Sequence, residues 1–445
     1  MVSILDFGAK SGLDSLQTKS VQNASDYCFR TGGGEVEIPK GSFLIGGIRL
    51  RSNVTLYLRK GARLIASRNP DDYELPSDDG VEKPIDKRLY EQEEKINGRS
   101  VDGLHYFRRW YRAIIKAYEA ENIAIVGEED SYIDGRDCYD ALGEEGYRGP
   151  HAICFCKCKN VKLDGYTVKD SGNWAHSIWE SQNIRCKRVT VLAGHDGLDI
   201  LGCDDVRVED CTFFSGDDAI AGFDNQNVVI ENNRFSSACS AFRFSGTGVL
   251  IRNCQINGNS PYLHRYTLSQ EEKETGVLLT DEQNPNHRYR MKSFYSYYAD
   301  YRLEIRKMPA NIVVENCTVD SPEKFFHFNF SGSECWSTNK PLTEIVFKNI
   351  VAKNLRLPIV AYGEAENPLR ITFENICFEI APDYADDCLF KTANLKRMEL
   401  KNCTVKGFQG KTTVKNYGVQ RGEILSDSFP VSVVETDEAF TVESI

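Results

Sequence analysis

The sequence predicts an all-β fold, a single-stranded parallel β-helix solenoid with about ten coils. Short strand-like segments start at Asn160, Asn183, Asp205 and Asn227, and these starts are 23, 22 and 22 residues apart. A period of roughly 20 to 50 residues is typical of a solenoid, in which each repeat buries its apolar face by stacking on its neighbours. The regular spacing is the first observation that supports this fold class.

The corners between the strands are the second observation. Many strands end in a charged residue followed by Asn or Asp and then Cys, as in Glu209-Asp210-Cys211 and Glu315-Asn316-Cys317. Asn and Asp tolerate the left-handed backbone of a sharp corner, and Cys packs well inside a coil. Leucine-rich repeats and helical repeats would show their own signatures, and neither signature is present in the sequence.

The N-terminal residues 1–45 are expected to cap the open end of the solenoid. Val21, Ala24 and Cys28 have the spacing of a helix over about residues 15–29, and three consecutive glycines follow it. A terminal coil exposes its apolar interior, so a covering helix would stabilise it.

Two long excursions interrupt the repeat, at about residues 70–115 and 257–310. Both are rich in arginine and aromatic residues, and loops of this length in a compact protein are usually functional or disordered. We expect them to wall the cleft of one domain over residues 1–445, with residues 406–445 as a C-terminal cap. A homo-oligomer interface formed by these Arg/Tyr-rich loops is the alternative.

The charge and the N-terminus narrow the classes of partner. The 445 residues include 54 Lys and Arg against 65 Asp and Glu, a net charge of −11, which argues against nucleic acid or an anionic membrane as the main partner. The sequence has no signal segment at its start and no apolar run of about 18 residues, so we expect a cytoplasmic location and no membrane span.

The 15 cysteines are expected to be reduced, buried thiols, with disulfides as the lesser alternative. Cys154, Cys156 and Cys158 alternate along one strand, which predicts a ladder of thiols on one face rather than a zinc site with spaced ligand pairs. No metal and no other cofactor is expected.

The most informative stretch contains two acidic pairs, each next to a glycine: Asp196 with Asp199, and Asp217 with Asp218. Asp196 and Asp218 are 22 residues apart, which is one period of the repeat. Asp196, Asp217 and Asp218 are therefore predicted to cluster on one surface of the stack. Carboxylates crowded on one face cannot all ionise easily, so the pKa of one is raised, which suits a general acid.

Several motifs together resemble the polygalacturonase-type glycoside hydrolases of family 28, which are right-handed parallel β-helices of the pectin-lyase-like superfamily. The most specific motifs are residues 196–199, similar to the end of the family's N-T-D-G-x-D, and residues 216–218, similar to its G-D-D. Further similar stretches are Asp6-Phe7-Gly8-Ala9, Gly127, Ile133-Asp134-Gly135, Asn160-Val161 and Ser171-Gly172-Asn173-Trp174-Ala175-His176.

The resemblance implies hydrolysis of glycosidic bonds with inversion, in oligosaccharides derived from pectin or related plant polymers. It implies that Asp217 is the general acid and that Asp196 and Asp218 hold the attacking water. Walls at the cleft and a cytoplasmic location lead us to expect exo action on short oligosaccharides. The alternatives are a non-catalytic carbohydrate-binding β-helix and a calcium-dependent polysaccharide lyase, which holds its ion with clustered aspartates.

Three motifs of the family are altered. Gly194-His195 stands in place of N-T, and the position of the family's G-H-G falls near Ala238-Cys239-Ser240. The family's R-I-K, which grips a uronate carboxylate, has no clear match, and residues 274–279 occupy about that region. The acids are retained and the substrate-recognition motifs are not. The resemblance therefore predicts glycosidic hydrolysis more strongly than it predicts a particular substrate.

Five residues around the acids are candidate substrate-binding residues: Trp174, His176, His195, Asp199 and Arg243. His176 and Arg243 are about one and two periods from Asp199, so we expect these three in one column of stacked residues. Arg243 would bind a substrate hydroxyl or carboxylate, or pair with Asp199. His195 would orient Asp196, contact a sugar or lie at a polar rim. Trp174 would stack on a sugar ring or pack in the core.

Overall fold

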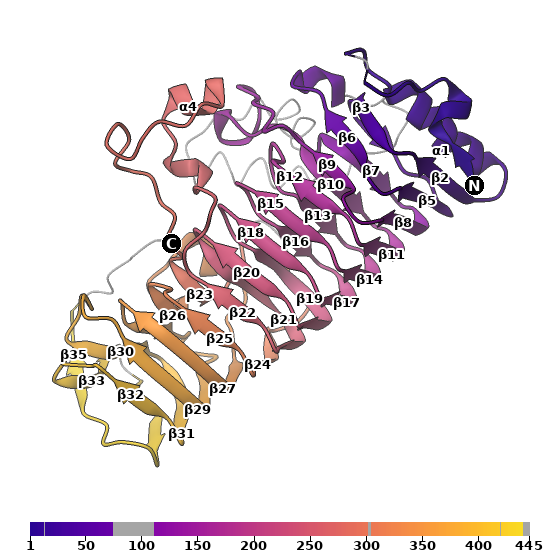
Figure 1. The fold of residues 1–445 in the computed structure, drawn as a ribbon. Coiled ribbons are helices and arrows are strands. Elements are labelled where there is room, and N and C mark those ends of the chain that lie inside the picture. Colours follow the sequence, from indigo (N-terminus) through magenta and orange to yellow (C-terminus); the bar gives the residue numbers. More distant parts are fainter. Residues whose placement is uncertain (13, 74–110, 301–303, 419, 439–445) are drawn as a thin grey trace. The chain divides into compact units, whose positions relative to one another are not determined.

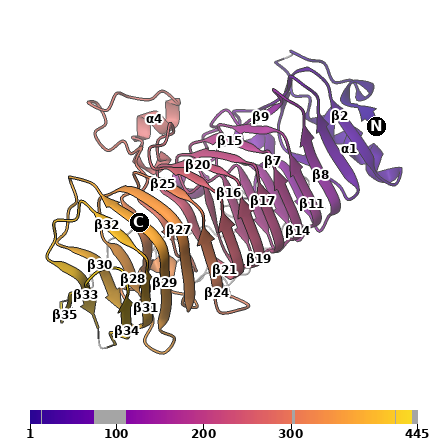
Figure 2. The ribbon, with the colours of Figure 1, turned by 60° about the horizontal axis from the view of Figure 1, so that its bottom comes forward.

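The computed structural model describes residues 1–12, 14–73, 111–300, 304–418 and 420–438 (Figure 1). The chain divides into two compact units, called unit 1 (Met1–Arg207 with Leu263–His287) and unit 2 (Val208–Tyr262 with Arg288–Ile445). Within each unit, strands at the same place in successive coils pair in parallel and form three rows. Figure 2 shows strands of successive coils beside one another. The predicted parallel β-helix is therefore confirmed.

The strands of unit 1 follow the coil order. The first row has β1 (Val2–Ser3), β2 (Gly34–Ile38), β5 (Val54–Leu58), β8 (Glu121–Gly127), β11 (Lys159–Asp164) and β14 (Gln182–Lys187). The second row has β3 (Gly41–Ile45), β6 (Ala62–Ala66), β9 (Tyr132–Asp134), β12 (Thr167–Lys169) and β15 (Thr190–Ala193). The third row has β4 (Ile48–Arg49), β7 (Ala113–Tyr118), β10 (His151–Cys156), β13 (His176–Trp179) and β16 (Leu198–Leu201). The chain passes into unit 2 within β17 (Asp204–Glu209).

In unit 2 some strands run through two rows. These long strands are β19 (Ile220–Glu231), β21 (Ser240–Arg252), β27 (Glu344–Leu355) and β29 (Leu369–Ile380). The first row also has β24 (Ala310–Glu315), β31 (Leu395–Lys401) and β34 (Glu423–Ser426). The second also has β18 (Thr212–Ser215), β20 (Arg234–Ser237), β22 (Gln255–Asn257), β25 (Thr318–Asp320) and β32 (Thr404–Lys406). The third also has β23 (Ser293–Ser296), β26 (Lys324–Asn329), β28 (Ile359–Tyr362), β30 (Cys388–Ala393), β33 (Thr412–Tyr417) and β35 (Val433–Thr436).

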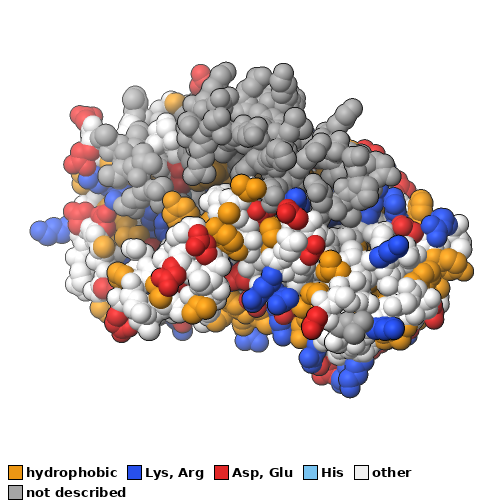
Figure 3. Space-filling view, turned by 90° about the horizontal axis from the view of Figure 1, so that it is seen from above, with side chains coloured by type: hydrophobic (Ala, Val, Ile, Leu, Met, Phe, Trp, Pro, Cys, Tyr) orange, Lys and Arg blue, Asp and Glu red, His pale blue; other side chains and the backbone are white. Residues whose placement is uncertain are grey.

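Alternating side chains fill the interior of the coils. In β11, Val161 and Leu163 are buried whereas Asn160 and Lys162 are exposed, as a period of two requires. In unit 2 the interior also contains stacked rings, such as Phe347 on Phe373, with centroids 5.6 Å apart and planes at 10°. On the face drawn in Figure 3, acidic and basic side chains of the described residues are intermixed.

The N-terminal helix is present as predicted. The helix α1 spans Thr18–Arg30 and buries Val21, Ala24 and Cys28. It packs against η1 (Ile4–Phe7) and the first coil. Among the described residues, no helix is long and apolar enough to cross a membrane.

The two excursions are described to different extents. Most of the first, residues 74–110, lies outside the described residues. The second contains the short helix α4 (Gln270–Thr275) and also β23, which pairs with β21 and β26. A strand of the third row thus lies within the excursion predicted at about residues 257–310. At the C-terminal end, paired strands continue as far as β35.

The cysteines whose side chains the structure describes are free thiols, and all but Cys377 are buried. Burial raises the pKa of Cys154 to about 12. A zinc ligand has to be a thiolate, so this neutral thiol fits the predicted ladder better than a metal site.

Asparagines form ladders along one corner of the coils. In unit 1 the amide of Asn122 donates to Asn53 (2.8 Å), Asn160 donates to Asn122 (2.8 Å) and Asn183 donates to Asn160 (2.7 Å). All four residues have φ between 52° and 61°, the left-handed region. Asparagine tolerates this conformation better than other residues with a Cβ, and stacked amides bond to one another, so the corner repeats in every coil.

We expect Asn160→Ala to lower the free energy of unfolding by about 1–3 kcal/mol, because it combines a left-handed alanine with the loss of two amide hydrogen bonds. Asn160→Gly is the matched control, since glycine keeps the backbone freedom and loses only the bonds. Urea unfolding of the wild type and both variants measures the cost of the left-handed alanine and the cost of the two lost hydrogen bonds. Equal stability of Asn160→Ala and wild type would contradict this explanation of the asparagine corner.

Candidate active site

The aspartates predicted as catalytic lie in turns that lead into strands of the third row. Asp196 is in unit 1, between β15 and β16, and its carbonyl accepts the N–H of Ala175 (2.9 Å). Asp217 and Asp218 are in unit 2, between β18 and β19, where the next N–H, of Ala219, donates to the carbonyl of Ser240 (2.9 Å). Each turn is thus fixed by a neighbouring coil of its own unit. The clustering of all three acids stays a prediction from the repeat.

His195 is held by contacts that the sequence did not reveal. Its ring is buried, and Nδ1 lies 3.3 Å from a guanidinium nitrogen of Arg148, which also donates to Asn173 Oδ1 (3.2 Å). A guanidinium can only donate, so Nδ1 accepts and the neutral ring carries its proton on Nε2. Tyr147 stacks on the same ring, with centroids 6.1 Å apart. The side chain that precedes Asp196 in the sequence is therefore oriented, and no sequence spacing pointed to Arg148.

Gly194 is explained by an arginine from the second excursion. A Cβ at Gly194 would collide with the guanidinium of Arg265, so only glycine allows this packing. Arg265 in turn pairs with Asp137. Burial raises the pKa of Asp137 to about 6, and the charge of Arg265 opposes the rise.

His176 faces the interior, and the column expected for it is wrong. Ser177, not His176, pairs with Asp199 between β13 and β16. His176 is fully buried, its Nδ1–H donates to the carbonyl of Gly197 (3.0 Å), and its Nε2 accepts from the hydroxyl of Tyr166 (2.9 Å). Burial lowers the pKa of His176 to about 4. Both ring nitrogens are used inside the coil, so this neutral histidine holds the turn before β16 instead of facing the cleft.

The buried histidine makes stability depend on pH. The pKa of His176 is about 4 in the folded protein against 6.5 in a free histidine, so the unfolded chain takes up the proton first as the pH falls. The stabilisation is complete above about pH 6.5 and is lost as the pH falls toward 4, at a cost of about 3 kcal/mol. We expect His176→Gln to lack this part of the pH dependence. Urea unfolding at pH 7, 5.5 and 4 tests it, and parallel curves for both proteins would refute it.

Asp199 stays a predicted substrate-binding residue, and Trp174 keeps both of its interpretations. Asp199 is buried on β16, beside Ser177 of the previous coil. Trp174 is partly buried, its ring lies 5.3 Å from that of His151, and it packs against a cluster of Tyr111, Ala113 and Cys154. The packing role of Trp174 thus has direct support, while its partial exposure leaves a face for a sugar.

Asp217 and Asp218 form a tightly held pair. Asp217 is 9% exposed and Asp218 is fully buried. The hydroxyls of Ser215 and Ser237 donate to the carbonyl of Asp217 (2.8 and 2.7 Å), and the N–H of Asp218 donates to Asp217 Oδ1 (3.1 Å). Burial raises the pKa of Asp218 despite the charge of Arg243, and Asp217 adds to the rise. The pair therefore keeps a proton at a pH at which an isolated aspartate would lose it.

Arg243 is the cation of this pair. Its NH1 lies 3.4 Å from Asp218 Oδ2, and its guanidinium lies over the rings of Tyr298 (4.3 Å) and Trp336 (4.7 Å). Burial works against its charge, but Asp218 together with Tyr298, Cys239 and Asp217 outweighs this effect, and the pKa of Arg243 is raised. Its NH2 has no hydrogen-bond partner among the residues that the structure describes. Arg243 is thus a fixed cation with a donor left for a ligand.

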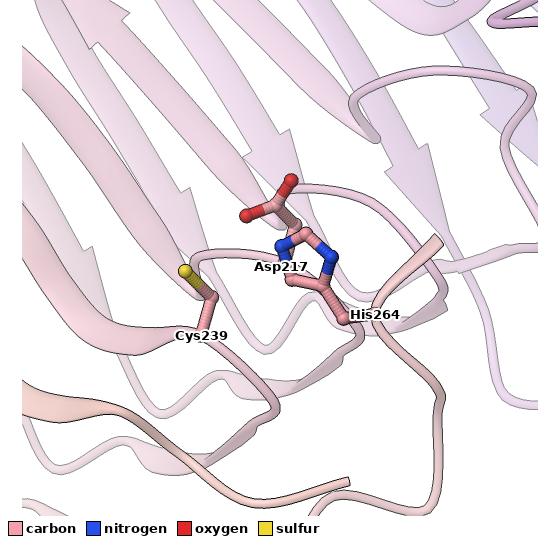
Figure 4. Close-up of side chains that lie close together, drawn as sticks. All are labelled: Asp217, Cys239 and His264. Carbon is pink, nitrogen blue, oxygen red and sulfur yellow. The ribbon is translucent and has the colours of Figure 1, made fainter. Parts of the chain in front are cut away.

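Cys239 stands where the family has the histidine of G-H-G. Its sulfur lies within 4.8 Å of an Asp217 carboxylate oxygen, as Figure 4 shows. Burial raises the pKa of the Cys239 thiol well above its usual range, and Asp218 and Asp217 raise it further. The thiol is therefore neutral and brings no charge to the pair. His264, also drawn in Figure 4, belongs to unit 1, where its Nδ1 accepts the N–H of Tyr266 (3.2 Å).

The structure supplies the basic motif that the sequence analysis did not find. Ser293 pairs with Ser240, and the N–H of Lys292 donates to the carbonyl of Cys239 (2.7 Å). Arg290-Met291-Lys292 therefore stands one coil after Cys239 and is similar to R-I-K, whereas the sequence analysis placed that region at about residues 274–279. The long excursion before it and the Met in place of Ile concealed the match. Burial lowers the pKa of Lys292, so an anion beside it would restore its preference for the charged form.

A further group in unit 2 has possible metal ligands, but its chemistry is unsuitable. Ligand atoms of Asp386, Asp387 and Cys388 lie within 4.8 Å of one another. Asp386 already pairs with Lys391 (2.7 Å), and burial raises the pKa of Cys388 to about 12. An engaged carboxylate and a neutral thiol are poor ligands for a cation.

Comparisons with known proteins agree with this description. A family model described as "Right handed beta helix region" matches residues 151–341. A Vitis vinifera protein named "Probable polygalacturonase" is 27% identical over 243 residues, 51% of this chain and 45% of that protein. An "Exo-poly-alpha-D-galacturonosidase" of Dickeya chrysanthemi is 37% identical over 73 residues, 16% of this chain and 12% of that protein. The structure of a Yersinia enterocolitica family 28 exopolygalacturonase has a TM-score of 0.65 at 18% identity, covering 97% of this chain and 79% of that one.

The fold is thus that of the right-handed parallel β-helix proteins, as expected from the sequence. Within that class, the resemblance to the polygalacturonase type is confirmed by the two curated relatives. The match spans less than half the length of either relative. What this chain does is therefore argued from its own residues.

Proposed function

We propose that the protein is an inverting glycoside hydrolase that cleaves galacturonate-containing oligosaccharides derived from pectin. The observation that carries the proposal is the Asp217–Asp218 pair, two adjacent buried carboxylates with a raised pKa on Asp218. Hydrolysis with inversion needs one protonated carboxyl for the leaving oxygen and one carboxylate for water. A pair that shares a proton can supply both forms.

In this mechanism Asp217 gives its proton to the glycosidic oxygen as the bond from that oxygen to the anomeric carbon breaks. Water attacks the same carbon from the opposite face, and its proton passes to the carboxylate of Asp218. The part of Asp196 in holding this water is the prediction from the repeat. The partial exposure of Asp217 suits the residue that reaches the substrate. Burial and Asp217 raise the pKa of Asp218 while Arg243 lowers it, so Arg243 favours the charged form of Asp218 that accepts the proton of water. The role of Asp217 as the general acid follows the family resemblance.

The basic residues of unit 2 support a uronate substrate. Lys292 and Arg243 stand on successive coils, because β23 follows β21 in the third row, and both carry donors suited to a carboxylate. The names of the curated relatives point to the same sugar. A substrate carboxylate beside Lys292 would offset the effect of burial on this lysine.

The two alternatives are less well supported. A calcium-dependent lyase would bind its ion with the acids, but the guanidinium of Arg243 already lies 3.4 Å from Asp218 and repels a cation. A non-catalytic groove would gain nothing from two adjacent buried carboxylates, whose desolvation is unfavourable.

Exo action and a cytoplasmic location are part of the proposal. The product pattern on a hexasaccharide tests the first, because an exo enzyme releases only the end residue or end unit from the beginning. Cell fractionation tests the cytoplasmic location. Light scattering tests the predicted homo-oligomer, which would form through the Arg/Tyr-rich loops.

Asp217→Asn should lower the hydrolysis rate on oligogalacturonates by at least about two to three orders of magnitude, the usual scale for a general acid. Asp383→Asn, which changes a surface partner of Arg356, is the matched control and should stay active. Reducing ends, the anomer formed first and absorbance near 235 nm would be followed with and without EDTA. Near-full activity of Asp217→Asn, or absorbance that EDTA abolishes, would overturn the proposal.

Lys292→Met should raise KM for oligogalacturonates about 10- to 100-fold, because a charge-assisted bond to a carboxylate is lost. Lys348→Met, at a surface pair with Glu374, is the control for a lost lysine. On carboxyl-reduced oligosaccharides the two variants should behave alike. An increase in KM of Lys292→Met that is equally large on the carboxyl-reduced substrates would show that this lysine does not bind the substrate carboxylate.

A further inference from the structure

A loop of unit 2 carries polar groups that are buried without hydrogen-bond partners. Residues 329–337 follow β26 and end in η6 (Cys335–Ser337). Asn329 is 1% exposed, and Ser337 is fully buried. Within the described part of the chain, neither polar atom of the Asn329 amide has a partner, and neither does the Ser337 hydroxyl. Buried polar groups are normally bonded, so these three atoms require an explanation.

The loop backbone is shaped around the Asn329 amide. The main-chain N–H of Glu334 donates to the main-chain carbonyl of Asn329 (3.4 Å), and the main-chain N–H of Ser337 donates to the main-chain carbonyl of Glu334 (2.9 Å). Gly332 packs against the amide so closely that a Cβ there would collide with it. The position of the amide is therefore built into the loop and is not a loose side chain.

The surroundings have the chemistry of a sugar site. His327 Nε2 lies 2.8 Å from Glu334 Oε2, and both side chains are buried. Trp336, on the same loop, is partly buried, and its ring lies over the guanidinium of Arg243 (4.7 Å). An aromatic face beside amide and hydroxyl groups is suited to the apolar face and the hydroxyls of a sugar ring.

The register places the loop near the proposed reaction site. Arg243 pairs with Ser296, and Ser296 pairs with His327, so the loop begins two coils after Arg243 in the third row. Successive parallel strands are about 4.8 Å apart. A ligand that reaches from Arg243 past Trp336 therefore arrives at this loop.

We propose that residues 329–337 form a subsite for the ring hydroxyls of a sugar residue of the substrate. The Asn329 amide and the Ser337 hydroxyl bond hydroxyls of the residue that packs on Trp336, while Arg243 takes the carboxylate of its neighbour. The loop contains no lysine or arginine, and its acid, Glu334, is held by His327. The loop therefore binds sugar hydroxyls and not a charged group. This subsite rests on the proposed function.

An ordered water could bond the same atoms without any ligand, and the two cases differ in a measurable way. If the groups bind a sugar, replacing Asn329 by leucine removes affinity and leaves the free protein as stable as before or more stable, because no bond in the free protein is lost. If they hold a structural water, the same change affects stability and leaves affinity unchanged.

The experiment uses Asp217→Asn as a background that does not cleave its ligand, and trigalacturonate as the probe in calorimetry. Adding Asn329→Leu should weaken binding at least about tenfold without lowering Tm. Gly332→Ala should weaken it similarly, because its Cβ displaces the amide. The control is Asn416→Leu, whose buried amide is bonded to Thr392 and Glu435. It should lower Tm and leave affinity unchanged.

Affinity within twofold of the background for Asn329→Leu would overturn the subsite, as would absence of trigalacturonate binding by the background itself. A wild type that binds trigalacturonate but never cleaves it would refute the proposed hydrolase. In that case the loss of binding in Asn329→Leu would still support the subsite.

Discussion

The site depends on the fixed register between successive coils. Parallel pairing allows one alignment of each strand on the next, and a slip of one residue would turn every outward side chain inward. The asparagine corners help to keep that alignment, because Asn160 bonds to Asn122 and accepts from Asn183 while adopting a left-handed backbone. On such a frame the turn at Asp217 and Asp218 cannot move away to find water. The two carboxylates stay buried and adjacent, and burial together with Asp217 raises the pKa of Asp218.

The repeat made the fold predictable, but small irregularities in its length limited how well the positions of the site residues could be predicted. A spacing near 22 residues and the Asn-Cys corners were enough to predict the coils, the N-terminal helix and the turns with the acids. His176 shows the limit, since it is 23 residues before Asp199 whereas its true partner Ser177 is 22 before it. A change of one residue in coil length moves a side chain from the outer face to the interior. Periodicity alone therefore predicts which coil a residue is in better than which way it points.

The residues around the acids could not be predicted from spacing because they come from loops and insertions. Arg148 reaches His195 from the segment before β10, and Arg265 reaches Gly194 from the second excursion. Lys292 returns to the third row only after that excursion, so its distance in sequence from Cys239 no longer shows that they are neighbours. Loops are not bound to the period of the coils. The coils supply the acids and Arg243 at repeated positions, and the loops and insertions supply Arg148 and Arg265, which hold the turn before Asp196.

The neutral thiol at Cys239 fits the charge balance of the acidic pair. A histidine there could take up a proton and place a second positive charge near Asp217 and Asp218, which would lower the pKa values of both. Cys239 stays uncharged, because its own pKa is raised by burial and by the two carboxylates. Arg243 then stabilises the charge of Asp218, while the proton remains with the pair. A carboxyl pair in which one pKa is raised in this way keeps a proton nearer to neutral pH, which suits the acid that the proposed hydrolysis needs.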